Sequence, residues 1–128
     1  VDATLSCPAP VGFFTVTPCR LLDTRVAGPA LAAGSDRTFV LAGQCGIPAE
    51  ARAVAVNVTA VGPTTGGDLK LQPGNTPLTV TSVLNYRAGR TRANNGVFAL
   101  GAAGDLSVHC DQPSGSVHVV LDVSGYFE

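Results

Sequence analysis

The sequence predicts an all-β fold, a β-sandwich of the immunoglobulin-like or jelly-roll-like type that is stapled by disulfides. Apolar runs rich in β-branched residues recur at intervals of roughly 8–12 residues, which gives about nine strands. Turns separate these runs, and the chain holds 15 Gly and 9 Pro. No stretch of about ten residues shows the period of an amphipathic helix.

The length of 128 residues indicates a single domain. Residues 1–12 include Pro8 and Pro10 and are expected to form an extended N-terminal segment, because proline disfavours a helix here. Residues 13–128 are expected to form the sandwich.

In the first half of the chain, each expected strand ends at a turn or a proline. These strands are Phe13–Thr17, Arg20–Thr24, Asp36–Ala42 and Ala53–Val61. The segment Val26–Ser35 is rich in Ala, Gly and Pro and is expected to be a loop. Gln44–Arg52 is expected to connect two strands, with one helical turn at Ala49–Arg52.

In the second half, the expected strands are Asp68–Gln72, Leu78–Tyr86, Thr91–Leu100, Asp105–Cys110 and Ser116–Phe127. The dipeptide Asn95-Gly96 is typical of a tight hairpin turn inside Thr91–Leu100. Because Val97–Leu100 needs a partner, we interpret Thr91–Leu100 as one interrupted strand.

The strand Ala53–Val61 is expected to be the centre of the fold. Alternate side chains of a strand point to opposite faces. The two faces, neither of them charged, are Val54, Val56, Val58 and Ala60, and Ala53, Ala55, Asn57, Thr59 and Val61. A strand on a wet surface should alternate apolar with polar residues, so we expect both faces to be covered. Ser116–Phe127 repeats the pattern.

The composition argues against several classes of partner. Charged residues make up 13% of the chain and the net charge is −1, whereas a protein that binds nucleic acid needs a basic face. No apolar run approaches the roughly 20 residues of a membrane span. The chain starts at Val1 and contains no Met, so we interpret it as a secreted product whose signal peptide has been removed.

The four cysteines predict disulfides in an extracellular, oxidising space. They include no Cys-x-x-Cys pair, and only two His are present, so a metal site is not expected. Three ways of pairing four cysteines exist. We favour Cys19–Cys45, with Cys7–Cys110 tying the N-terminal segment to a late strand.

Two groups of polar residues are candidates for a network. Arg20, Asp23 and Arg25 can grip an anionic or sugar ligand, or can order the loop that follows them; we favour the structural role. In this role Asp23 accepts from backbone amides and a nearby arginine, and Arg25 reaches Asp122. The polar residues Asn57, Asn85 and Asp122 lie in otherwise apolar strands and need partners. The partners are a ligand bound in a cleft or, as we favour, polar groups of neighbouring strands or of another subunit.

No arrangement of residues predicts catalysis or a cofactor. His109 and His118 form a weak metal pair, and the chain contains no Gly-x-Ser-x-Gly motif and no recognisable pair of catalytic carboxylates. We therefore expect no enzyme. Sugar-binding modules usually offer flat aromatic side chains, and Tyr86 is the one that we expect to be exposed as a ligand platform.

Several motifs occur in a defined order. They are Thr17-Pro-Cys-Arg-Leu-Leu-Asp-Thr-Arg25, Ala42-Gly-Gln-Cys-Gly-Ile-Pro48, Asn57-Val-Thr59, Asn85, Arg92-Ala-Asn94 and Asp122-Val-Ser-Gly-Tyr-Phe127. Together they resemble a family of secreted bacterial β-rich domains, often C-terminal modules of large extracellular proteins. That family has no established activity, so the resemblance implies secretion and modularity. Its cysteines matching Cys19 and Cys45 often occur together, which supports their pairing; Cys7 and Cys110 depart from its commoner pattern.

Two functional hypotheses follow from these patterns. In the first, the chain is a non-catalytic secreted structural module that associates with copies of itself, as a subunit of an extracellular filament or surface assembly. The N-terminal segment can then add a strand to the open edge of a neighbouring subunit. In the alternative, the chain is an accessory module of a secreted protein that binds polysaccharide.

Overall fold

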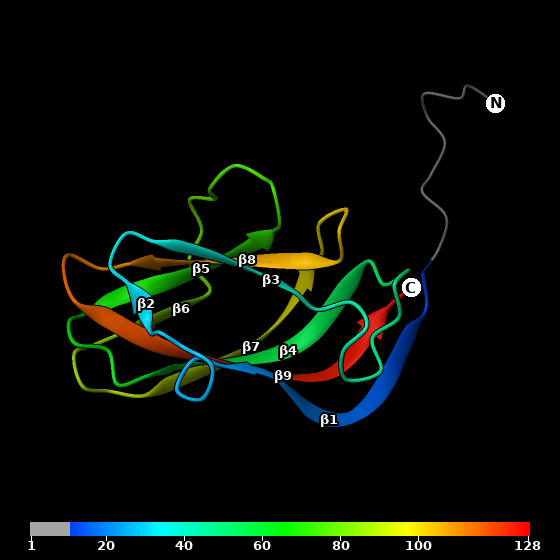
Figure 1. Cartoon of the computed structure of the whole chain (residues 1–128), viewed down its shortest axis with the longest axis horizontal. Coiled ribbons are helices and arrows are strands. Elements are labelled where there is room, and N and C mark those ends of the chain that lie inside the picture. Colours follow the sequence, from blue (N-terminus) through cyan, green and yellow to red (C-terminus); the bar gives the residue numbers. More distant parts are fainter. Residues whose placement is uncertain (1–10) are drawn as a thin grey trace.

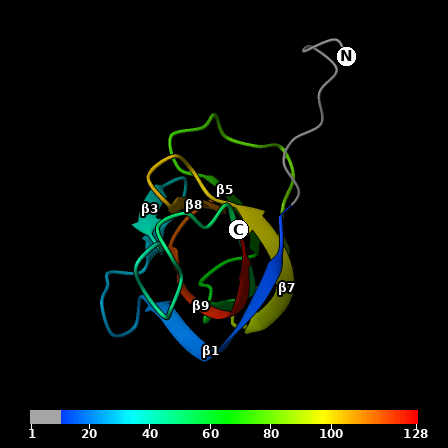
Figure 2. The ribbon, with the colours of Figure 1, turned by 90° about the vertical axis from the view of Figure 1, so that its right-hand side faces the viewer.

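The computed structural model describes residues 11–128 and confirms the all-β sandwich. Two antiparallel sheets lie as layers on either side of one core (Figures 1 and 2). The first sheet has the strand order β1-β9-β4-β7, with the short β2 also paired to β9. The second sheet has the order β3-β8-β5-β6. Within residues 11–128, no helix has the length and apolar character needed to cross a membrane.

The strand bounds follow the expected turns closely in most of the chain. They are β1 Phe13–Asp23, β2 Leu31–Ala32, β3 Asp36–Val40, β4 Ala53–Val61, β5 Gly67–Pro73, β6 Leu84–Tyr86, β7 Arg92–Ala99, β8 Asp105–Asp111 and β9 Ser116–Phe127. The central strand β4 has the predicted bounds, because its β-branched run contains neither Gly nor Pro.

The core lies between the inner faces of the two sheets. The inner residues of β4 are 0–3% exposed, and those of β9 are similarly buried. Leucines and valines of β5 and β8 close the core from the second sheet. The inward positions are Val54, Val56, Val58, Ala60, Val117, Val119, Leu121, Val123, Leu69, Leu71, Leu106 and Val108. Alternation along each strand therefore predicts the core correctly.

The first strand is longer than the sequence indicates. The expected strands Phe13–Thr17 and Arg20–Thr24 are one strand, β1, which continues through Pro18. The pairing of β1 with β9 is irregular between Thr15 and Cys19. Proline is tolerated at this position because β1 is the edge strand of the first sheet and Pro18 needs no partner for a backbone N–H.

Three other local predictions are wrong. Val26–Ser35 is not all loop, because β2 pairs with β9 where β1 ends. The expected helical turn at Ala49–Arg52 is a β-turn, in which Ala51 N donates to Pro48 O. Only the end of Leu78–Tyr86 forms a strand, β6, because the preceding residues are held over the second sheet by Gln72.

The strand β7 is continuous across Asn95-Gly96. Both residues pair with β4, Asn95 with Asn57 and Gly96 with Val56, so the expected interruption is absent. The long pairing partner β4 overrides the local turn preference of Asn-Gly.

The outer face of β4 is only half-buried, whereas we expected full cover on both faces. Ala53, Ala55, Asn57, Thr59 and Val61 are shielded by neighbours within the same sheet. Small side chains sink between the larger ones of flanking strands, which hides part of their surface without a second layer. Within residues 11–128, no further layer of strands packs on this face (Figure 1).

Candidate functional site

The outer face of the first sheet carries an apolar surface at one end. The strand register aligns two rows of outward positions, Phe13, Phe127, Ala53 and Ala99, and Thr15, Gly125, Ala55 and Val97. We call these eight residues the apolar end. Two of its large side chains are open to solvent, with Phe13 50% exposed and Val97 58% exposed.

The aromatic side chains of the apolar end are packed against the sheet. The Phe13 and Phe127 ring centroids are 4.9 Å apart. The Phe13 ring also covers Gly125, where an added Cβ would collide with the ring. Gly125 is therefore required for this close approach, and the ring presents a fixed apolar surface.

The next positions on the same face are polar. Arg20, Asp122, Asn57 and Asn95 form a row across the four strands. The Arg20 Nε atom lies 2.8 Å from Asp122 Oδ1, in an ion pair that is open to solvent. This cross-strand pair ties β1 to β9.

Beside this row, Asp23 is held by two arginines. Arg25 donates to Asp23 from its backbone N–H at 3.0 Å and from its guanidinium at 2.9 Å, and Arg20 lies 3.5 Å away. The hydrogen bonds from Arg25 lower the pKa of Asp23 from 3.8 to about 2, against the opposing effect of desolvation. A carboxyl with this pKa is a poor general base at neutral pH.

The structure brings together only part of the predicted polar network. Arg20, Asp23, Arg25 and Asp122 are in contact, and Asp23 accepts from a backbone amide and from arginine as predicted. It is Arg20 that reaches Asp122, and not Arg25, because Arg20 lies directly opposite Asp122 while Arg25 follows the end of β1.

The two predicted asparagines do not join this cluster. Asn57 lies opposite Asp122, but its side chain donates to Thr59 Oγ1 at 3.4 Å. Asn85 belongs to β6 in the second sheet, where it accepts from Ser82 Oγ at 3.1 Å. The network predicted from these asparagines therefore divides between the two sheets.

Tyr86 is not the exposed platform that the sequence indicates. Its side chain points into the core, the residue is 6% exposed, and its hydroxyl donates to Gln112 Oε1 at 2.7 Å. Burial raises the pKa of Tyr86 above its ordinary value. A sugar has no flat aromatic face to bind at this position.

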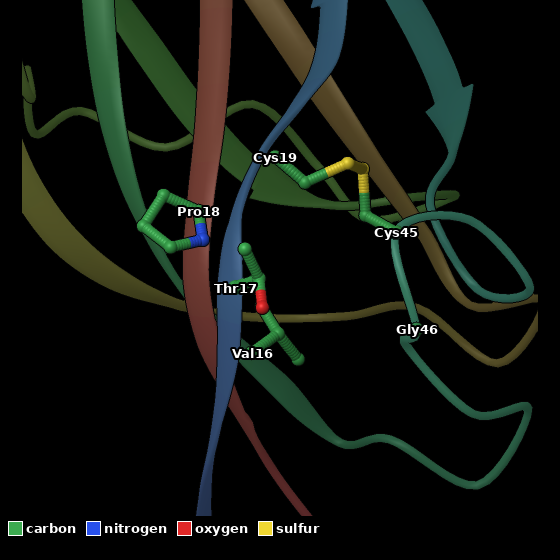
Figure 3. Close-up of a pocket in the computed structure, with 6 residues that line it drawn as sticks. All are labelled: Val16, Thr17, Pro18, Cys19, Cys45 and Gly46. Carbon is green, nitrogen blue, oxygen red and sulfur yellow. A yellow bond between two sulfur atoms is a disulfide. The ribbon is translucent and has the colours of Figure 1, made fainter.

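The disulfide Cys19–Cys45 is confirmed, with the two Cα atoms 5.8 Å apart. It joins edge strand β1 to the loop before β4 (Figure 3). A shallow hollow of about 460 Å³ lies beside it, lined by Val16, Thr17, Pro18, Cys19, Cys45 and Gly46. Together, the crosslinked loop and Pro18 obstruct the free edge of β1.

The second predicted disulfide, Cys7–Cys110, is not formed by Cys110 in this structure. Cys110 is a free cysteine, 0% exposed, and faces the core between the two sheets. Its Sγ atom lies 3.9 Å from the Tyr86 hydroxyl, and burial raises the pKa of the thiol. Cys7 lies outside the described residues.

The outer face of the second sheet holds a cluster that we did not predict. Lys70 is 9% exposed and lies between two carboxylates, 3.2 Å from Asp68 and 2.5 Å from Asp111. Lys70 lowers the pKa of Asp111 through a hydrogen bond. Nearby, His109 Nδ1 lies 2.6 Å from Asp36 Oδ1. Charges at alternate positions of one strand, as in Asp68-Leu-Lys70, were the available signal.

A loop covers part of this second outer face. Gln72 donates to Thr76 O at 2.8 Å and accepts from Thr79 N at 2.7 Å, so its side chain fixes the loop between β5 and β6. No group of three or more His, Cys, Asp or Glu side chains that can hold a metal occurs in residues 11–128.

Comparisons with known proteins are sparse. No family model matches the chain, and no curated protein matches it, so the resemblance to a secreted bacterial family stays a prediction. Among solved structures, two of the Tobacco streak virus coat protein, one of them of its dimer, each show 14% identity and a TM-score of 0.45. Each match covers 94% of this chain and 89% of the coat protein chain. At this level of similarity, the likeness carries no argument about function.

Proposed function

We propose that the chain is a non-catalytic structural module that associates with copies of itself through the outer face of the first sheet. The observation that carries this proposal is the apolar end, where Phe13 is 50% exposed and Val97 is 58% exposed. Contiguous exposed apolar surface is a feature of interaction sites. The small residues Ala53, Ala55 and Ala99 let another surface approach closely.

The polar part of the same face gives such a contact its specificity. Arg20 and Asp122 lie next to the apolar end, and charges at the rim of an interface fix register and exclude wrong partners more than they add affinity. A stable interface of ordinary size buries roughly 800 Å² on each partner. An interface that spans both the apolar end and the polar row uses most of the sheet face.

We further propose that the protein is secreted and that the assembly is an extracellular filament or surface layer. The Cys19–Cys45 disulfide supports an oxidising compartment. A non-catalytic role is supported by the arginines around Asp23, since they hold this carboxylate ionised rather than poised for proton transfer.

Sedimentation velocity from micromolar to millimolar concentration tests self-association, and electron microscopy of the same samples shows its form. We expect species larger than one chain that grow with concentration. A monodisperse monomer at the highest concentration would contradict the proposal. Closed particles of fixed size would contradict the filament while leaving self-association in place.

A further inference from the structure

A polar hollow lies at the seam where the β6 edge of the second sheet meets β7 of the first. Its volume is about 310 Å³, at the lower end of the size of ligand pockets, and it is lined by Asn85, Tyr86, Arg87 and Arg92. β6 and β7 are the terminal strands of their sheets, and they lie side by side. The hollow is far from the apolar end along β4, because Arg92 pairs with Ala60.

The register of β7 places polar groups at this seam. Arg92 and Asn94 lie opposite Ala60 and Val58, whose side chains face the core, so both occupy core-facing positions of β7. Asn94 donates to Val83 O at 2.9 Å and is satisfied. Arg92 remains exposed at the mouth of the seam.

In the described part of the chain, arginines without a carboxylate partner gather in the stretch that forms this region. Arg20, Arg25 and Lys70 lie within ion-pair distance of carboxylates. Across residues 11–128, no carboxylate lies within that distance of the three exposed arginines that follow β6. These are Arg87, Arg90 and Arg92.

The loop between β6 and β7, which carries Arg87 and Arg90 and leads into Arg92, is held in place by backbone hydrogen bonds. Gly89 N donates to Pro63 O at 2.7 Å, and Arg90 N donates to Arg87 O at 3.1 Å. Asn85 Oδ1 accepts from Ser82 Oγ, which leaves the side-chain NH₂ group of Asn85 as a donor on one of the residues that line the hollow. An ordered loop reduces the entropy lost on binding.

A purely structural role can account for Arg92, but not for the other residues that line the hollow. A charge at a core-facing position of an edge strand discourages pairing with another chain. That role requires neither Arg87 nor the free amide of Asn85 on the other sheet, and all three line the same hollow.

We propose that this seam binds an oxyanion carried by a saccharide, so that the protein holds an acidic polysaccharide chain. Guanidinium groups bind carboxylate and sulfate through paired hydrogen bonds, and Arg87 and Arg92 supply two such groups. The Asn85 amide suits a sugar hydroxyl or ring oxygen. The net charge of −1 disfavours general attraction to polyanions such as nucleic acid, so binding depends on this local cluster.

Isothermal titration with three soluble polysaccharides tests the proposal: polygalacturonate, dextran sulfate and neutral dextran. We expect binding to at least one charged chain, weakened by salt, and none to neutral dextran. Preference between the two charged chains shows whether carboxylate or sulfate is the natural group. Absence of binding to both, or equal binding to neutral dextran, would overturn the proposal.

A matched pair of variants locates the site. The double variant R87Q/R92Q should weaken binding at least tenfold. R52Q is the control, because it removes an exposed arginine at the opposite end of β4. It should leave binding within about twofold, since salt screens the effect of a charge that lies far from the site. Equal weakening by R52Q and by either single variant, R87Q or R92Q, would show diffuse charge attraction and overturn the assignment.

Thermal unfolding of each variant checks that the fold is intact, which we expect because these side chains are exposed. Titration with poly-glutamate completes the experiment. Binding tighter than that of both acidic polysaccharides would show that the ligand is an acidic peptide and would overturn the saccharide class.

Discussion

The outer faces of the two sheets differ in how far the chain itself pairs their charges and covers their surface. On the second sheet, Lys70 is enclosed by Asp68 and Asp111, and Gln72 fixes a loop over the strands. On the first sheet, charges are paired only in the middle of the face, and the apolar end is left open. On the second sheet, the chain itself pairs the charged groups and covers part of the outer face. On the first sheet, no part of residues 11–128 covers the apolar end in this way.

This difference shows that burial and polarity must be considered together. Lys70 and Gln72 are polar yet buried, and Val97 and Phe13 are apolar yet exposed. Both observations reverse the ordinary expectation for a sheet surface. We infer that the second face serves the stability of the single molecule and that the first face serves contact with another molecule.

The largest expected effect comes from a charge placed on the apolar end. Val97→Lys should abolish self-association, because an ammonium group in an apolar contact is left without a partner. The stability of the single chain should change by no more than about 0.5 kcal/mol, since Val97 is largely exposed. Sedimentation velocity measures the first effect and thermal unfolding the second.

Val80→Lys is the matched control, since Val80 is 94% exposed on the loop over the second sheet. It should associate as the wild type does. If both variants associate normally, the apolar end is not the contact and the contrast between the faces loses its functional meaning.

The next effect compares a polar residue from each outer face. Gln72→Ala removes both hydrogen bonds that fix the loop, leaves Thr79 N without its partner, and should cost about 1–3 kcal/mol. Asn57→Ala, on the outer face of β4, should cost about 0.5 kcal/mol or less, because its one side-chain bond is long. Urea unfolding of both variants measures the difference. Equal costs would show that the second face is not the more self-contained one.

A smaller effect is expected inside the second sheet. Tyr86→Phe removes the hydroxyl that bonds to Gln112 and should cost about 0.5–1.5 kcal/mol. Urea unfolding again provides the measurement. A variant as stable as the wild type that has lost saccharide binding would instead make the Tyr86 hydroxyl a ligand contact of the seam.

The smallest effect concerns acid. The pKa of Asp23 is lowered to about 2 in the folded protein, so its ion pair stabilises the fold above the ordinary value of 3.8. That contribution is lost as the pH falls from about 4 toward about 2, where the folded carboxyl takes up its proton. Asp23→Asn should flatten the dependence of the melting temperature on pH in this range.

Arg25→Gln should flatten the same range, because it removes the hydrogen bonds that lower the pKa of Asp23. A wild-type slope in both variants would show that the pair contributes nothing to acid stability. Such a result would leave only the Arg20–Asp122 pair to order the polar part of the first face.

The sequence predicted elements with strong local signals and failed where distant contacts decide. β4 has its predicted bounds because its valines and Thr59 favour a strand and no Gly or Pro interrupts it. Leu78–Val83 is equally β-branched, but Gln72 of another strand holds this region as a loop. The competing contact cannot be seen in the local pattern.

The same limit applies to the candidate site. The pairing of Arg20 with Asp122 depends on the register of β1 against β9, which includes two irregularities. The burial of Cys110 was within reach, because Leu106, Val108 and Cys110 alternate along β8 and share the inward face. Alternation in β6 likewise places Tyr86 beside Leu84 in the core.

Hydroxyl-radical footprinting at low and high protein concentration tests most directly whether the outer face of the first sheet is covered by another copy. The account predicts that Phe13 and Val97 lose their oxidation on concentration while Val80 and Leu78, on the second sheet's loop, keep theirs. Unchanged oxidation of Phe13 and Val97, or equal protection of all four residues, would contradict it.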